Sequence, residues 1–215
     1  MNLVIFNYSM NSNSLVFSHQ KSIAEGLLKY FTKIVVVTAE PVTEPTNPLL
    51  EVVSTNWREG KHLSNLWNFY CVAIPLSWKY RHSIFFSHMT DVQAFLIAPF
   101  LKVLKSKHFL WYAHRSKSLY LRLTYPLING VITSTPGSCP LKGSRIFPIG
   151  QSIDDSRLSS IERRPSCPPT KWFHVGRLDP SKNIEIIISS LNKFRKKYPD
   201  ITLDLYGTSS SKTYN

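Results

Sequence analysis

The sequence has few cysteines, few acids and no long apolar run, and each shortage excludes a class of protein. The three cysteines lie far apart and form no C-x-x-C pair, so neither a disulfide framework nor a zinc site is expected at Cys71, Cys139 or Cys167. No apolar stretch reaches the ~18 residues of a membrane span. The opening MNLVIFNYSMNSNS lacks the basic and apolar regions of a signal peptide, so we expect a cytoplasmic globular protein.

Acidic residues are scarce: 13 Asp and Glu stand against 26 Lys and Arg, which gives a formal net charge of +13. No acid occurs between Asp91 and Asp154, whereas the interval carries Lys102, Lys105, Lys107, Arg115, Lys117, Arg122, Lys142 and Arg145. Such a balance favours an anionic partner, whether nucleic acid, an anionic membrane leaflet or a phosphate-bearing substrate. A solubilising basic face is the plain alternative for any single lysine.

Apolar runs of strand length alternate with helical patterns along the first part of the chain. Strands are expected in LVIFNY, KIVVVTAE, EVVSTN, HSIFFSH, KHFLWYAH and GVITSTP. Helices are expected around residues 23–28, 63–80, 91–104 and 117–127. This alternation predicts an α/β domain with a mostly parallel sheet covered by helices.

A serine- and proline-rich stretch, SIDDSRLSSIERRPSCPPT, follows and is typical of a linker between domains. We therefore expect residues 1–165 to form a first domain with its linker, and residues 166–215 to begin a second domain. The second part offers one strand in TKWFHV, one helix and one strand in ITLDLYG. Two strands and one helix are too few to bury both faces of a sheet, so we expect a truncated second domain with apolar side chains left exposed.

The turn between the strand TKWFHV and its helix carries the strongest chemical signal. Gly176 allows the chain to turn, and Asp179 or Ser181 is the expected N-cap of a helix with an apolar face at Ile184, Ile187, Ile188, Leu191 and Phe194. The spacing predicts a strand, a turn and a helix in succession.

Arg177 and Lys182 flank the start of that helix. The N-terminus of a helix offers unpaired N–H groups and a positive dipole end, so two added cations favour an anion there, above all a diphosphate. The spacing alone leaves two interpretations equally open: a phosphate site, or two solvated surface cations beside an ordinary helix cap.

The string VGRLDPSKN, the apolar helix after it and YPDITLDLYG resemble the start of the donor-binding domain in glycosyltransferase family four, whose members are retaining sugar transferases of the GT-B fold. Four earlier strings resemble a bacterial branch that builds surface polysaccharides: MNSNSLVFSHQ, WYAHRSKS, VITSTPGS and FPIGQSID. The resemblance implies two Rossmann-like domains, of which the first is complete and the second only begun. Asn183 stands where the family usually carries glycine, and the loop 9–14 lacks the glycine pair that many members have there.

By this resemblance Arg177 and Lys182 hold the diphosphate of a nucleotide-sugar donor, which is the co-substrate, and neither a metal nor another cofactor is expected. His114, which ends FLWYAH, contacts the transferred sugar or its phosphates, and a structural histidine at a strand end is the alternative. His88, which ends SIFFSH, is expected to be structural.

The first loop contributes three further candidates. Asn13, Ser14 and His19 either hydrogen-bond to donor or acceptor, or belong only to a turn, which is the usual role of Asn and Ser in a loop.

The implied reaction is sugar transfer with retention, in which cations stabilise the charge that develops on the leaving diphosphate. The acceptor is expected to be a glycan or a lipid-linked glycan, within cell-surface polysaccharide biosynthesis. The basic charge and the aromatic stretch around Trp67, Tyr70 and Trp78 suggest peripheral contact with an anionic inner leaflet.

Two other functions stay open. One is an incomplete transferase that binds sugar nucleotide without turnover: no E-x7-E string follows Thr170, so the 215 residues alone are expected to be inactive. The other is a basic nucleic-acid-binding module. Because the sequence shows no RNP string, helix-turn-helix pattern or zinc-finger spacing, a nucleic-acid partner is not expected.

Overall fold

The computed structural model describes residues 1–14, 17–41, 47–151, 171–178 and 180–208. The chain divides into two compact units, Met1–Ile153 and Asp154–Asn215, and each is described by itself. The domain boundary expected at residues 165–166 lies outside the described residues.

The first unit is built on a seven-stranded sheet in which every neighbouring pair is parallel. Its strands are β1 (Asn2–Asn7), β2 (Lys33–Thr38), β3 (Leu50–Ser54), β4 (Ile84–His88), β5 (Lys107–Trp111), β6 (Gly130–Thr133) and β7 (Ile146–Pro148). The spatial order is β3-β2-β1-β4-β5-β6-β7. The order reverses direction between β1 and β4, and the carboxyl ends of strands at such a point form a crevice for ligands.

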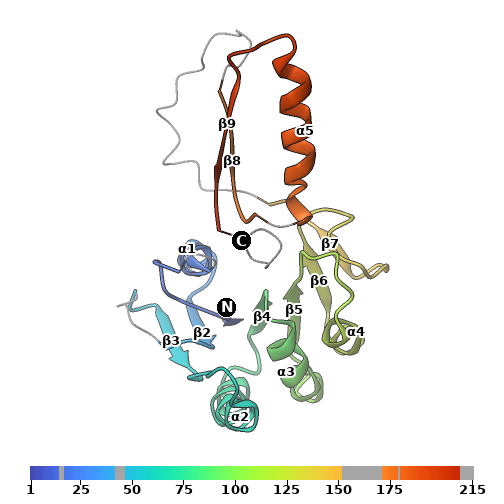
Figure 1. Cartoon of the computed structure of the whole chain (residues 1–215). Helices are drawn as coiled ribbons and strands as arrows, with labels where there is room; N and C mark the ends of the chain where they lie inside the picture. The colour runs from blue at the N-terminus through green and yellow to red at the C-terminus, as the bar shows by residue number, and fades with distance from the viewer. Residues whose placement is uncertain (15–16, 42–46, 152–170, 179, 209–215) are drawn as a thin grey trace. The chain divides into compact units, whose positions relative to one another are not determined.

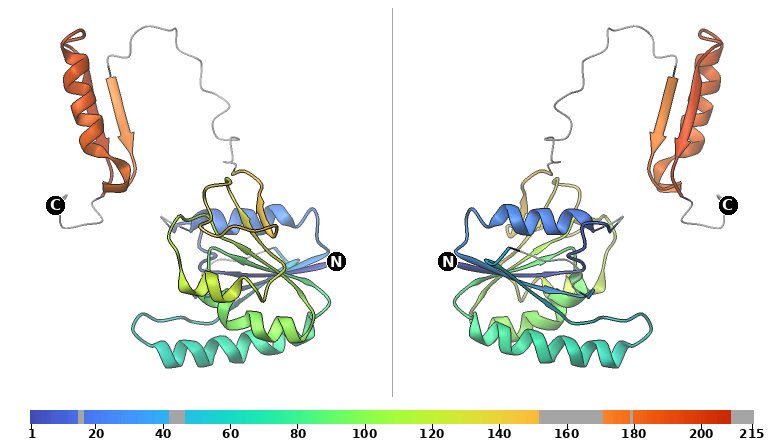
Figure 2. Two further views of the ribbon diagram at one scale, coloured as in Figure 1. Left: turned by 90° about the vertical axis from the view of Figure 1, so that its right-hand side faces the viewer. Right: turned by 90° about the vertical axis from the view of Figure 1, so that its left-hand side faces the viewer.

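Four helices cover the two faces of this sheet (Figures 1 and 2). One face carries α1 (Ser18–Leu27), and the other carries α2 (His62–Lys79), α3 (Asp91–Val103) and α4 (Leu119–Thr124). A parallel sheet between two helical layers confirms the predicted α/β fold with a Rossmann-like first domain.

The alternation of side chains along β1 explains how the core forms. Leu3 and Ile5 point to one face and pack in a cluster with Ala24 of α1. Val4 and Phe6 point to the other face, in a second cluster that contains buried residues of α2 and α3. Because both faces are covered, the central strands are apolar at nearly every position, which made them easy to recognise in the sequence.

Two details of the first unit differ from the sequence prediction. Strand β7 was not predicted, because it has only three residues, ends in a proline and is mostly exposed. The helix expected at 117–127 is only six residues long, and it begins after Ser118, whose side-chain oxygen accepts a hydrogen bond from the Leu121 N–H group.

The second unit pairs β8 (Lys171–Val175) with β9 (Thr202–Tyr206) in parallel, and it includes the helix α5 (Ile184–Arg195). The indole of Trp172 packs against the ring of Phe194 on this helix, with 5.1 Å between ring centroids. Phe173 and Val175 alternate with Trp172 along β8 and are 73 % and 71 % exposed. The exposure of apolar side chains expected in this part of the chain is therefore observed.

Candidate functional site

The loop after β8 is fixed against the loop after β9. The Gly176 N–H group donates to the Tyr206 carbonyl at 2.9 Å, and the Leu178 N–H group donates to the Thr208 carbonyl at 3.0 Å. A Cβ atom at Gly207 would overlap with the carbonyl oxygen of Gly176, so only glycine permits this approach. Arg177, which lies in the loop, is exposed.

Lys182 ends a short 3-10 turn, Pro180–Lys182, and is also exposed. The next residue, Asn183, is the N-cap of α5 and has the left-handed conformation, with φ 52° and ψ 45°. Its carbonyl oxygen accepts hydrogen bonds from the Ile186 and Ile187 N–H groups. The expectation that Asp179 or Ser181 would be the N-cap is therefore wrong.

The left-handed conformation explains the residue type at position 183. Glycine adopts it without penalty, and asparagine tolerates it better than most residues do. Asn183 therefore suits a position where the resemblance to glycosyltransferase family four led us to expect glycine. The structure places Arg177 and Lys182 in one connection, from the carboxyl end of β8 to the start of α5. Their contact with a diphosphate stays a prediction.

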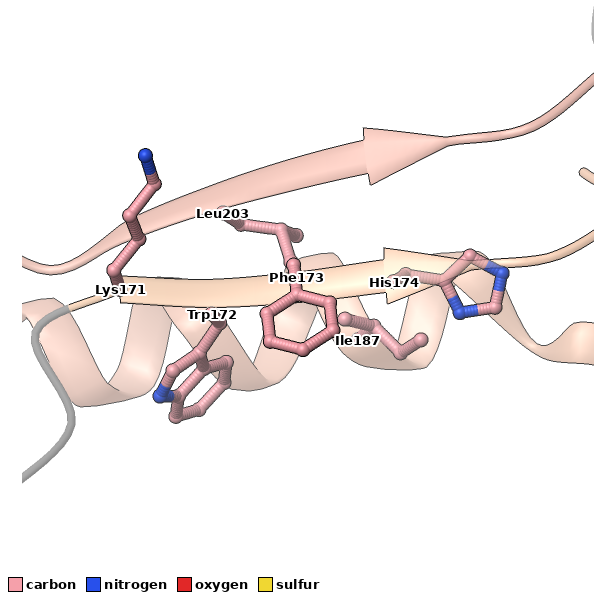
Figure 3. A pocket seen from close by; sticks show the side chains of 6 residues that line it. All are labelled: Lys171, Trp172, Phe173, His174, Ile187 and Leu203. Atoms are coloured by element: carbon pink, nitrogen blue, oxygen red, sulfur yellow. The ribbon is translucent and has the colours of Figure 1, made fainter. Parts of the chain in front are cut away.

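A hollow of about 300 Å³ lies in the second unit beside β8 and α5 (Figure 3). Its walls are Lys171, Trp172, Phe173, His174, Ile187 and Leu203, most of them apolar. Neither Arg177 nor Lys182 lines it. Because the hollow lacks these two cations, we assign it to loose packing between strand and helix and not to the diphosphate site.

In the first unit, the loop after β1 is held by short-range hydrogen bonds. The Asn13 N–H group donates to Oδ1 of Asn11 at 2.8 Å, and Oγ of Ser14 accepts from the Phe17 N–H group at 3.1 Å. These are the bonds of a turn that leads into α1. A contact of Asn13 or Ser14 with donor or acceptor stays a prediction.

Gln20 of α1 fixes this loop to the sheet, a role that was not predicted from the sequence. Its Oε1 accepts from the N–H groups of Tyr8, at 3.1 Å, and Ser9, at 2.9 Å, while its Nε2 donates to the His88 carbonyl at 3.4 Å. The side chain is buried. A glutamine inside a helix gives no sequence signal for such a role, because the three partners come from the ends of two different strands.

Two histidines meet at the carboxyl edge of the first sheet. His19 is exposed on α1, and its ring centroid lies 5.6 Å from that of His88, the last residue of β4. His88 is buried, and burial together with the nearby His19 lowers the pKa of its imidazole to about 4. His88 is therefore neutral near pH 7, in agreement with a structural role.

His114 lies in the loop after β5 and is exposed, as are its neighbours Arg115 and Lys117. Its ring packs edge-on against Tyr112, with 5.7 Å between centroids. The position at a carboxyl strand end is the one predicted for it. Its contact with the transferred sugar stays a prediction.

A pocket of about 250 Å³ lies at the carboxyl edge of the first sheet, where the strand order reverses. Residues that follow β1, β2, β3 and β4, together with the first turn of α3, form its walls: Tyr8, Ala39, Trp57, Met89, Thr90, Asp91, Val92 and Gln93. Met89 has φ 59°, which is uncommon for a residue other than glycine. No pattern in the sequence indicated this pocket.

The polar groups of this pocket include hydrogen-bond acceptors that suit a hydroxylated ligand. Gln93 is 4 % exposed, and its Oε1 has no hydrogen-bond partner among the described residues. An unpaired buried amide oxygen is costly unless a ligand or water satisfies it. Asp91 accepts a hydrogen bond from Oγ of Ser118, and Trp57 and Tyr8 add aromatic surface.

No group of three or more His, Cys, Asp and Glu side chains in the described part of the chain is placed to hold a metal ion. Over the same residues, every helix is too short or too polar to cross a membrane.

No family model matches the chain, and no curated protein matches it. Solved structures do. HepE from Anabaena, in complex with UDP, has 13% sequence identity and a TM-score of 0.61, over 97% of this chain and 61% of HepE. The lipopolysaccharide outer core galactosyltransferase WaaB, in its apo form, has 6% identity and a TM-score of 0.63, over 100% of this chain and 70% of WaaB.

The UDP-GlcNAc 2-epimerase from Methanocaldococcus jannaschii is also similar, with 11% identity and a TM-score of 0.54 over 95% of this chain. The chain spans less than two thirds of the length of HepE and of this epimerase, 61% and 65%. At such low identity these likenesses show the fold, and they confirm the GT-B type predicted from the sequence. Membership of glycosyltransferase family four stays a prediction.

Proposed function

We propose that this protein is a glycosyltransferase that moves a sugar from a nucleotide-sugar donor to a glycan or a lipid-linked acceptor, with retention, in cell-surface polysaccharide biosynthesis. The observation that carries the proposal is the placement of Arg177 and Lys182 on the connection from β8 to α5. Parallel strands bind ligands at their carboxyl ends, and helix starts favour anions. The shared fold supports it, because one similar structure contains UDP and another is a galactosyltransferase.

The donor site would act on charge that develops during the reaction. As the bond between sugar and diphosphate breaks, the leaving group gains negative charge, and Arg177 and Lys182 would stabilise it where it forms. In this proposal the two cations take the place that a metal ion has in other transferases, so no metal is required. The leaving phosphate itself would serve as the base, and His114 would position the sugar.

The acceptor would use the pocket where the strand order reverses. Its aromatic walls at Trp57 and Tyr8 suit the apolar face of a sugar ring, and Oε1 of Gln93 would accept a hydrogen bond from a sugar hydroxyl. The reaction would take place in the cytoplasm, at the inner face of the cell membrane, where lipid-linked glycans are accessible.

A binding experiment on the 215-residue chain tests the donor site. UDP, GDP and ADP are titrated into isotope-labelled protein, and amide shifts are followed by NMR. We expect one diphosphate to shift residues 176–178 and 182–187. Arg177→Ala should weaken its affinity by roughly 10- to 100-fold, because a hydrogen bond to a charged group is lost.

Lys196→Ala is the matched control, because Lys196 is an exposed cation that follows α5 in the same unit. It should bind as the parent chain does. Equal affinity of all three proteins would contradict the proposed donor site. RNA binding that falls steeply with salt and exceeds binding of every nucleotide would instead indicate a nucleic-acid-binding protein.

A further inference from the structure

Helix α2 carries a row of exposed apolar side chains. Leu63 is 84 % exposed, Trp67 is 72 % exposed and Trp78 is 59 % exposed, with Ile74 and Cys71 also exposed between the two tryptophans. The successive spacings of three or four residues place all five on one side of a helix. We call these five residues the α2 outer face.

The opposite side of α2 is turned toward the interior. It contains the buried residues Asn65, Phe69, Ala73 and Ser77. Figure 2 shows α2 in teal in the outer part of the helical layer, on the side of the sheet that α1 does not cover. The α2 outer face is therefore a solvent-exposed apolar surface that the packing of this unit does not explain.

The structure also changes the set of residues that the aromatic stretch suggested. Tyr70 does not belong to the outer face, because its hydroxyl donates to the Leu96 carbonyl of α3 at 3.3 Å and its ring packs against Phe69. Leu63 and Ile74, which no aromatic pattern marks, belong to it.

Cations stand at both ends of this surface. Helix α2 contains no Asp or Glu. Exposed cations precede it at Arg58 and Lys61, with the exposed acid Glu59 between them, and two more stand at its carboxyl end, Lys79 as its last residue and Arg81 just beyond. The guanidinium of Arg81 lies 5.6 Å from the ring centroid of Trp78 and donates to the Trp78 carbonyl, so a charge is held beside an exposed indole.

We propose that the α2 outer face docks on an anionic lipid bilayer, with Trp67 and Trp78 at the level of the headgroups and the flanking cations on lipid phosphates. A helix with an apolar face and basic flanks lies in the plane of the interface, and Trp is favoured there. A second copy of the chain is a poorer partner, because two α2 outer faces in contact would bring the cations of both copies together. The inference sharpens the proposed membrane location and does not depend on the donor site.

Flotation of the full 215-residue chain with lipid vesicles tests the proposal. Phosphatidylcholine vesicles with and without phosphatidylglycerol are compared at low and high salt. We expect binding to the anionic vesicles that weakens as salt rises. Trp67→Ser combined with Trp78→Ser should lower the affinity at least ~10-fold. Lys79→Gln with Arg81→Gln should lower it by roughly fivefold for each charge removed.

Tyr30→Ser is the matched control, because Tyr30 is 73 % exposed and lies just after α1, the helix on the opposite face of the same sheet. It should bind as the parent chain does. Circular dichroism shows whether each variant is folded, and Leu63→Ser provides a second, smaller change of the outer face.

Cys71 gives a direct reading of insertion, because it is exposed on the same face whereas Cys139 is buried. An environment-sensitive fluorophore is attached to Cys71 in a Cys167→Ser background, and its emission should shift to the blue on anionic vesicles. Equal flotation with neutral and anionic vesicles, or no emission shift, would overturn the proposal. The proposal would also be overturned if the parent chain did not bind vesicles but formed a dimer that is lost in the double tryptophan variant.

Discussion

The two units of the chain repeat the same strand–helix–strand pattern, yet they bury their side chains to very different degrees. In Met1–Ile153 the sheet has helices on both faces, and core residues such as Val35 and Phe85 are fully buried. In the described part of Asp154–Asn215 a two-stranded sheet is accompanied by a single helix, and Phe173 and Val175 are largely exposed. The comparison shows that the number of layers, more than the apolar content of a strand, decides how much is buried.

The loops of the candidate sites in the two units also differ in what holds them in place. In the first unit the loop after β1 is held by the buried side chain of Gln20, which also reaches the end of β4. In the second unit the backbone N–H groups of Gly176 and Leu178 tie the loop after β8 to the neighbouring loop after β9. A site held by a buried side chain is preorganised, whereas a site held by a pair of loops depends on the stability of those loops.

A matched pair of substitutions gives the largest expected effect. Phe85→Ala in β4 should lower the free energy of unfolding of the first unit by about 3–5 kcal/mol, because it opens a cavity in a closed core. Phe173→Ala in β8 should change the stability of the second unit by less than about 0.5 kcal/mol, because the ring is already in solvent. Hydrogen exchange in urea, followed separately for the amides of each unit, measures both.

Leu205→Ala is a useful companion, because this apolar residue of the second unit is only partly exposed and should give an intermediate value. If Phe173→Ala proved as costly as Phe85→Ala, the exposed face of β8 would be covered in solution, and the contrast between the two units would fail.

The central strands were predictable because their physics is local. NLVIFN and KIVVVT are apolar at almost every position, as strands buried on both faces must be. The apolar period of α5 was recognised too, although only Ile184 and Leu191 of that face are buried, while Ile188 and Phe194 are exposed. Strand β7 was missed because three residues ending in proline carry no period. The N-cap of α5 was missed because the left-handed conformation of Asn183 leaves no trace in hydrophobic spacing.

The candidate sites also differ in how far the sequence could indicate them. Arg177 and Lys182 could be proposed from the sequence because both lie in one contiguous motif, and their role stays a prediction. The pocket at Trp57 and Gln93 was not, because its walls come from segments that only the strand order brings together. A sequence reveals a site most readily when one turn supplies its residues.

The closed core of the first unit buries a titratable group, the imidazole of His108. His108 is 1 % exposed, and burial lowers the pKa of its imidazole to about 3, from an ordinary value of about 6.5. Between these pH values the unfolded chain binds the proton and the folded chain does not, so stability is full above pH ~6.5 and falls as the pH drops. The first unit should lose on the order of 2–3 kcal/mol between pH 7 and pH 4 from this residue.

His108→Gln tests this directly, because glutamine keeps a polar group near Oγ of Ser87, which lies 2.9 Å from Nε2 of the histidine, and does not titrate. The free energy of unfolding of the first unit, measured with urea across this pH range, should depend less steeply on pH in the variant than in the parent. His88 would remain as a smaller contribution of the same sign, because its pKa is lowered to about 4. A variant with the parent's pH slope would show that His108 is not the cause.

The smallest effect concerns the start of α5, and it isolates the second unit. Asn183 has φ 52°, so Asn183→Val should cost about 1–2 kcal/mol, because a β-branched side chain is strained in the left-handed conformation, whereas Asn183→Gly should be close to neutral. Exchange of the Ile186 and Ile187 amides, which donate to the Asn183 carbonyl, should accelerate in the valine variant, while the amides of the first unit keep their rates. If valine were tolerated as well as glycine, Asn183 would not be left-handed in solution. The position of Lys182 beside the start of α5 would then also be wrong.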